Sequence, residues 1–280
     1  MGTWSPATWL SSGGVMRRGL LKAVFLAAAL SLSLALSMGL GRQASAYPIM
    51  PFPREKTPVE VLLNVISLSI PSIIISSLLA SAVKYAKAVI LRGLIILGAF
   101  TAVLMARGIL EAHEGLPSIL LLWFLMCIVV LSTLAVVVPP PEEVMAFLHL
   151  IYGSILGAFI GVNSPTSSIL LLLAAFAIYD IFFSRWVRSE REGREGLRIA
   201  VPLEGVEVGI GDIIFYSLVA SHTVRYFGML MALQASTLMM FGCALNLLIA
   251  YRLGSIPGLP IPLALGVLPI LTTQFTGWGG

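Results

Sequence analysis

Apolar stretches recur along nearly the whole of this 280-residue chain, and only short polar segments separate them. Each stretch approaches the roughly 20 residues that a helix needs to cross the hydrocarbon core of a bilayer. A helix also satisfies its own backbone N–H and C=O groups, which lipid cannot do. With 58% hydrophobic and 11% charged residues, the composition excludes a water-soluble globular protein. The sequence therefore predicts an all-α polytopic membrane protein.

Nine transmembrane helices are predicted. They cover residues 20–40, 59–83, 88–107, 117–138, 144–161, 168–185, 209–229, 231–250 and 258–275. Three consecutive prolines at 139–141 end the fourth span, and Glu142 and Glu143 suit the positively polarised start of the fifth helix. Almost no polar residue separates the seventh span from the eighth, so this boundary is the least clearly marked.

The first span has a second interpretation as a secretion signal. Arg17, Arg18 and Lys22 precede its apolar run, and the sequence Ala-Ser-Ala at 44–46 is similar to a signal-peptide cleavage site. The run itself is longer than the apolar part of most signal peptides, which favours a retained helix. A signal-like segment at residues 1–46 stays as the alternative, and both interpretations give the same topology downstream.

The distribution of lysine and arginine predicts the orientation. If the N-terminus is cytoplasmic, twelve of these residues lie in cytoplasmic segments and five lie outside. An excess of positive charge marks the cytoplasmic side, so we predict a cytoplasmic N-terminus, an external C-terminus and a place in the cell membrane. The largest polar loop, residues 186–207, then lies in the cytoplasm. Its interleaved arginines and glutamates indicate a solvated, partly flexible connector and argue against nucleic-acid binding.

Asp180 and Asp212 are the only aspartates in the chain, and both fall inside apolar spans. Asp180 lies five residues before Arg185 and Asp212 five residues after Glu207, which places each carboxylate roughly 7–8 Å inside the charged boundary. The two spans are consecutive and antiparallel, so both acids lie in the same leaflet. An aspartate in a helix centre costs about 2.5–3.5 kcal/mol and usually faces a cavity or a partner.

Two carboxyl groups that meet in a pocket of low dielectric cannot both ionise, so they share one proton. One carboxylate can then remove a proton from water while the other acid protonates a carbonyl oxygen, as in aspartic proteases. The sequence thus predicts that Asp180 and Asp212 form a water-activating pair. Gly209 and Gly211, just before Asp212, are expected to allow close helix approach and a less regular backbone.

A third element is expected at the same depth. Pro257 lies five residues after Arg252, and Pro260 and Pro262 follow it closely. Three such prolines cannot all occupy a helix interior, so the start of the ninth span should be irregular. Irregular backbone inside a membrane is buried in protein or lines a wet cavity, and it can offer N–H and C=O groups to an extended peptide. A simple entry turn for the last helix is the alternative.

These motifs together resemble the presenilin and signal-peptide-peptidase family of GxGD intramembrane aspartyl proteases, in particular presenilin homologues of the archaeal type. The matching residues are Tyr179 and Asp180 on the sixth span, Gly209, Ile210, Gly211 and Asp212 on the seventh, and Pro257, Gly258, Leu259 and Pro260 before the ninth. Gly258 stands where the family usually has alanine. The resemblance implies catalysis by Asp180 and Asp212, with the other motif residues shaping the site.

The same resemblance implies a division of the chain and a class of substrate. Residues 1–162 would form a scaffold of five helices and residues 163–280 a catalytic part of four. The substrates would be transmembrane proteins or peptides, with their N-terminus outside because the predicted sixth span runs inward. No cofactor or metal would be needed, and the oligomeric state stays open. The short cytoplasmic loop argues against the self-cleavage known in presenilins.

Other interpretations remain for the same residues. A transporter or channel can use intramembrane aspartates as proton or cation sites. Prepilin peptidases also use a glycine-aspartate motif, but they generally follow it with valine and lysine, whereas Ile213 and Ile214 follow Asp212 here. Tyr179 can be a packed side chain without a role at the acids. The histidines at 113, 149 and 222 have no ligand spacing, so no metal site is predicted.

Overall fold

The computed structural model describes residues 24, 27–36, 55–70, 93, 96–104, 116–137, 142–190, 200–203, 206–253 and 257–276. Most of the signal-like segment 1–46 and most of the charged positions that predict orientation lie outside these residues. Within them, every one of the nine predicted spans contains helix. The three N-terminal spans are represented by helical residues 27–36, 58–70 and 96–104.

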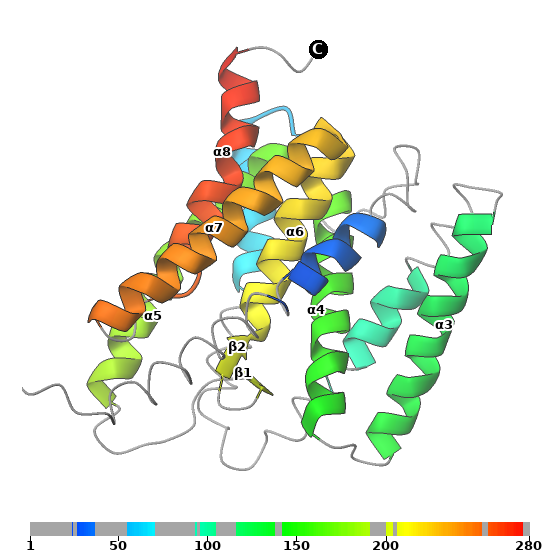
Figure 1. The fold of residues 1–280 in the computed structure, drawn as a ribbon. Coiled ribbons are helices and arrows are strands. Elements are labelled where there is room, and N and C mark those ends of the chain that lie inside the picture. The colour runs from blue at the N-terminus through cyan, green and yellow to red at the C-terminus, as the bar shows by residue number, and fades with distance from the viewer. Residues whose placement is uncertain are drawn as a thin grey trace, which may run out of the picture.

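The later helices have well-defined bounds, and their ends follow the expected signals. They are α3 (Leu116–Val137), α4 (Glu142–Asn163), α5 (Thr166–Glu190), α6 (Ile210–Phe227), α7 (Met229–Leu253) and α8 (Pro260–Thr276). α3 ends before the three prolines, and α4 begins at Glu142, as predicted. Figure 1 shows α3 at the edge of the molecule and α5, α7 and α8 gathered on the other side of α6.

A single glycine separates α6 from α7. Gly228 has a φ of 90°, a left-handed conformation that glycine adopts without the steric cost of a side chain. Its N–H donates to the carbonyl of Val224 at 3.2 Å, which closes the last turn of α6 in the manner of a glycine cap. The boundary that lacked a polar marker is therefore fixed by backbone conformation.

The prediction of an all-helical chain with a flexible 186–207 loop is wrong in part. α5 continues to Glu190, and β1 (Ala200–Leu203) pairs antiparallel with β2 (Val206–Gly209), with Val201 opposite Val208. Apolar residues alternate with Pro202 and Glu207 along these strands, which is the period of two typical of a β-hairpin. The dense charge of the preceding residues hid this short pattern. The hairpin lies directly before α6 and, in Figure 1, at the opposite end of the molecule from the C-terminal end of α8.

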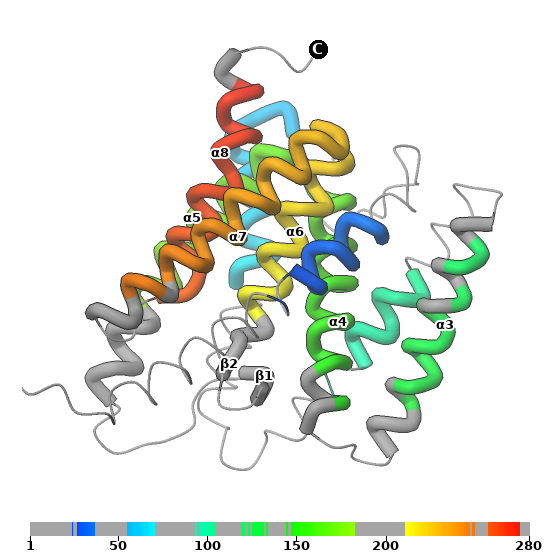
Figure 2. The backbone as a smooth tube through the Cα atoms, in the orientation of Figure 1, coloured from blue at the N-terminus to red at the C-terminus, as the bar shows by residue number. Residues whose placement is uncertain are grey.

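α4 and α6 pack closely along their lengths (Figure 2). Gly153, Gly157 and Gly161 recur every four residues and form one face of α4. A Cβ atom on Gly157 would overlap the backbone oxygen of Ile214, and one on Gly161 would overlap atoms of α6 in the same way. Small residues at this spacing let membrane helices approach until their backbones touch. This contact holds α6, and with it Asp212, against the centre of the molecule.

Large apolar side chains cover the outside of the helices. Trp123 is 67% exposed, Phe182 65% and Leu230 71%, a surface that suits hydrocarbon rather than water. By length and hydropathy, one helical segment among the described residues, Met229–Asn246, is sufficient to cross a bilayer, and shorter apolar helices accompany it.

Candidate active site

Asp212 lies in the first turn of α6, where the helix dipole is positive and favours an acidic side chain. Gly209, predicted to lie on the seventh span, is instead the last residue of β2. The chain therefore changes from strand to helix between Gly209 and Ile210. A Cβ atom on Gly211 would meet no described atom within 4 Å. Among the described residues, no helix therefore packs directly on Gly211, and the close approach expected there stays a prediction.

Asp180 lies on α5 and is partly buried, as is Tyr179 before it. The Tyr179 ring packs edge-on against Phe176, with ring centroids 6.4 Å apart. Phe176 in turn lies 4.7 Å from Phe215 of α6, again between centroids. These rings connect α5 with α6 close to the acids. They account for the packing of the Tyr179 ring, and a role for Tyr179 at the acids stays a prediction.

Residues 257–259 lie outside any helix, as predicted for the start of the ninth span. Pro260 is the first residue of α8 and Pro262 lies in its first turn, where a missing N–H breaks no helical hydrogen bond. The N–H of Leu263 donates to the carbonyl of Leu259 at 3.1 Å and begins the helix. The segment 257–259 is therefore not helical, and α8 begins only at Pro260.

Both aspartates contact this irregular segment. The backbone N–H of Leu259 donates to Oδ2 of Asp180 at 3.0 Å. The two carboxylate oxygens of Asp212 lie 3.3 and 3.4 Å from the position that a Cβ atom would take on Gly258. Standard backbone dimensions then put the two carboxylates within about 10 Å of each other. The segment before α8 thus contacts both α5 and α6. It brings together Asp180, Asp212, Gly258 and Leu259.

Two further residues at this place were missed by the sequence analysis. Nδ2 of Asn246, on α7, donates to the carbonyls of Pro257 at 2.9 Å and Gly258 at 3.1 Å. The hydroxyl of Tyr216, on α6, donates to the same Gly258 carbonyl at 3.2 Å. Tyr216 is 2% exposed. Its position four residues after Asp212, on the same helix face, was the available signal.

His222 forms hydrogen bonds with neighbouring helices. His222 is fully buried, and its ring nitrogens lie 2.9 Å from the carbonyl of Gly161 and 3.0 Å from Oγ1 of Thr166. Because a carbonyl only accepts, Nδ1 carries the proton and Nε2 accepts from the threonine hydroxyl. Within the described part of the chain, no three His, Cys, Asp or Glu side chains gather as a metal site would require.

The chain can be compared with known proteins through its structure. It matches a solved structure of a presenilin-family intramembrane aspartate protease with a TM-score of 0.61, over 92% of this chain and 99% of that one. The chain has the presenilin fold. This is the fold of an integral membrane protein, and it is shared here at 16% sequence identity. No protein-family model matches the sequence, and no curated protein matches it either.

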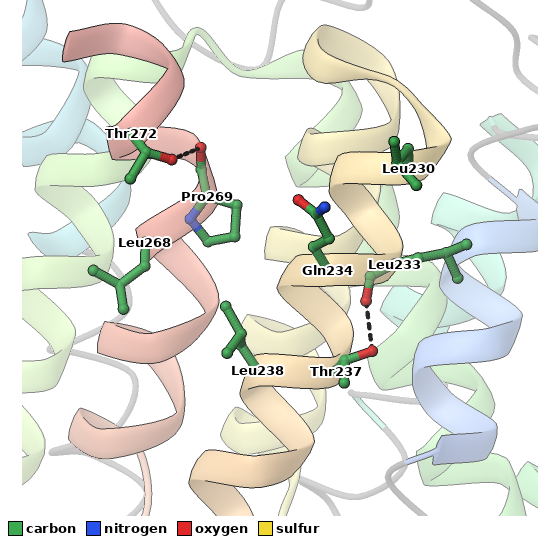
Figure 3. A pocket seen from close by; sticks show the side chains of 8 residues that line it. All are labelled: Leu230, Leu233, Gln234, Thr237, Leu238, Leu268, Pro269 and Thr272. Carbon is green, nitrogen blue, oxygen red and sulfur yellow. Dashed lines mark hydrogen bonds between the residues drawn. The ribbon is translucent and has the colours of Figure 1, made fainter. Parts of the chain in front are cut away.

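A groove of about 530 Å³ lies elsewhere on this presenilin fold, between α7 and α8 (Figure 3). Its lining consists of Leu230, Leu233, Gln234, Thr237, Leu238, Leu268, Pro269 and Thr272. The hydroxyls of Thr237 and Thr272 donate to carbonyls of their own helices, at 2.8 and 2.9 Å. The lining includes neither aspartate and no ionisable side chain, so this groove is separate from the place where Asp180 and Asp212 contact residues 258 and 259.

Proposed function

We propose that this protein is an intramembrane aspartyl protease that hydrolyses peptide bonds within transmembrane segments, with Asp180 and Asp212 as its water-activating pair. The observation that supports this most directly is that both carboxylates contact residues 258 and 259, in a chain with the presenilin fold. The three elements that carry the motifs are α5, the start of α6 and the segment before α8. Their contacts at residues 258 and 259 support the proposal.

The proposed reaction uses water and the two side chains. A water molecule between Asp180 and Asp212 attacks the scissile carbonyl, one aspartate takes its proton, and the other donates a proton to the carbonyl oxygen. As the C–N bond breaks, the leaving nitrogen takes up the proton that the first aspartate removed from water, and a hydroxyl of the tetrahedral intermediate returns a proton to the second aspartate. Activity then requires one shared proton, so the rate should fall at both low and high pH. No metal or nucleotide enters this scheme.

The substrate would be a transmembrane protein or peptide that reaches the site from the lipid bilayer. A regular helix shields its carbonyls, so the substrate must lose helical hydrogen bonds before attack. Among the described residues, none contacts the Cβ position of Gly211, and the non-helical backbone at 257–259 can offer polar groups to an unwound segment. The GxGD-type assignment and the cell membrane as location are parts of the same proposal.

Replacement of either aspartate by asparagine tests the proposal. In liposomes that contain a transmembrane peptide, Asp180→Asn and Asp212→Asn should each lower the rate of cleavage at least about hundredfold, because general acid–base catalysis contributes that much. Glu60→Gln is the matched control. Glu60 caps the helix 58–70 together with Thr57, accepting from the Thr57 N–H at 3.2 Å, and glutamine can keep this cap.

The alternative of a transporter or channel predicts a different result. Ion-coupled uptake that depends on both aspartates, without cleavage of the peptide by the unaltered protein, would contradict the protease proposal. Full cleavage by either asparagine variant would also contradict it.

A further inference from the structure

The peptide unit between Gly258 and Leu259 connects α7 with the candidate catalytic pair. Its carbonyl accepts hydrogen bonds from Asn246 and Tyr216, and its N–H donates to Asp180. The C=O and N–H of a trans peptide unit point in opposite directions within one plane. The two side chains that hold the carbonyl therefore also fix the direction of the N–H toward Asp180.

The orientation of the Asn246 amide is determined by its neighbours. The carbonyls of Pro257 and Gly258 can only accept hydrogen bonds, so the NH₂ group of Asn246 must face them. Its Oδ1 is then buried and has no hydrogen-bond partner among the described residues. Leaving a buried acceptor unsatisfied costs about 1–3 kcal/mol. An apolar residue at 246 would avoid this cost, but it would also remove both donated hydrogen bonds.

The position of Asn246 suits this task. Gly242 lies one turn earlier on α7, and a Cβ atom there would lie 2.6 Å from Cα of Pro262. This contact brings the start of α8 against the face of α7 that carries Asn246. Without the amide, the Pro257 carbonyl would lose its hydrogen bond from Asn246 and the Gly258 carbonyl would keep only the one from Tyr216, so the non-helical segment would be held less firmly between the two acids.

We propose that Asn246 is a positioning residue for the aspartate pair: it holds the Gly258–Leu259 peptide unit so that its N–H meets Asp180 and Gly258 faces Asp212. As a role in catalysis, this inference rests on the proposed function. The hydrogen bonds that the Asn246 amide donates go to the carbonyls of Pro257 and Gly258. Asn246 acts through the backbone of residues 257–259.

Hydrogen exchange tests the positioning without any assay of activity. Between residues 257 and 262, the only backbone N–H groups belong to Gly258, Leu259 and Ile261, because the other three residues are prolines. Asn246→Leu should accelerate deuterium uptake of this peptide at least about tenfold, because local opening exposes its amides. Gln234→Leu is the matched control, an amide-to-leucine change in the α7–α8 groove, and should leave uptake unchanged. Equal uptake in Asn246→Leu and the unaltered protein would overturn the inference.

Kinetics then separate positioning from binding. We expect Asn246→Leu to lower kcat at least about tenfold with KM changed less than about twofold, since displacement of a catalytic group by less than 1 Å has effects of this size. Tyr216→Phe removes the second donor to the same carbonyl, so the double variant should lose less than the product of the single losses. A rise in KM alone, or a loss equal to that product, would count against the inference.

The two proposals fail in different ways. If Asp180→Asn and Asp212→Asn are inactive while Asn246→Leu cleaves normally, the positioning role is wrong and the protease proposal stands. If the unaltered protein does not cleave, the protease proposal fails, and deuterium uptake still decides whether Asn246 holds the segment.

Discussion

At the scale of single residues, Gly258 is the point where this chain departs from the family that it resembles. In this structure the Asp212 carboxylate lies close to where a side chain at 258 would begin. Alanine would place a methyl group 3.3–3.4 Å from both carboxylate oxygens, closer than such contacts usually are. The carboxylate would have to move by a few tenths of an ångström.

Gly258→Ala should therefore lower kcat by about threefold to tenfold, since catalysis is sensitive to such displacements. Thermal stability should change little, because the side chain of Asp212 can shift. The measurement is kcat in the liposome cleavage assay. Gly93→Ala is the control, because a Cβ atom on Gly93 would meet no described atom within 4 Å. An unchanged kcat in Gly258→Ala would show that the carboxylate has more freedom than the contact implies.

The sequence allowed prediction of some residues at the candidate site and not of others. Asp180 and Asp212 were conspicuous because charge is costly inside an apolar span. Asn246 carries no charge and lies on α7, eleven residues before Pro257. The sequence alone does not show that this side chain contacts the segment before α8. Side chains that act by holding backbone groups are visible only once the helices are packed.

At the scale of helices and strands, the contact between α4 and α6 tolerates no side chain at the α4 glycines Gly157 and Gly161. Gly157→Ala should destabilise the fold by about 1–3 kcal/mol, the usual cost of overpacking. The obstacle is the backbone oxygen of Ile214, which cannot rotate away as a side chain would. Thermal unfolding in detergent should show a lower Tm for this variant, while Gly93→Ala serves again as the control. A Tm equal to that of the unaltered protein would mean that α4 and α6 can separate without cost.

Helix ends were predictable where local chemistry marks them. The prolines after α3 and Pro257 before α8 lie outside the helices, and Glu142 favours the start of α4. The boundary at Gly228 depends on backbone conformation, and the hairpin on a pattern of only four residues in each strand. A pattern of four residues is a weak predictor of a strand, and the many charged residues nearby favour the prediction of a loop.

At the scale of the whole molecule, the orientation in the membrane would decide which substrates the proposed protease can cleave. The hairpin and the C-terminal end of α8 lie at opposite ends of the molecule (Figure 1). The excess of arginine and lysine around the 186–207 loop predicts that the hairpin end is cytoplasmic. The acids lie near the hairpin, because Asp212 follows β2 by three residues. Cleavage is then expected near the cytoplasmic boundary of the substrate.

Labelling of single cysteines in intact cells tests this orientation. With a reagent that does not cross the membrane, Thr276→Cys at the end of α8 should be labelled from outside, and Glu207→Cys in β2 only after the cells are opened. The unaltered protein measures the background from Cys127 and Cys243, which both lie within helices. Because an unwound substrate must run in one direction past the two acids, a peptide with its N-terminus outside should be cleaved at least about tenfold faster than its reversed counterpart. External labelling of Glu207→Cys, together with a preference for the reversed peptide, would invert the assignment of both sides while leaving the site itself intact.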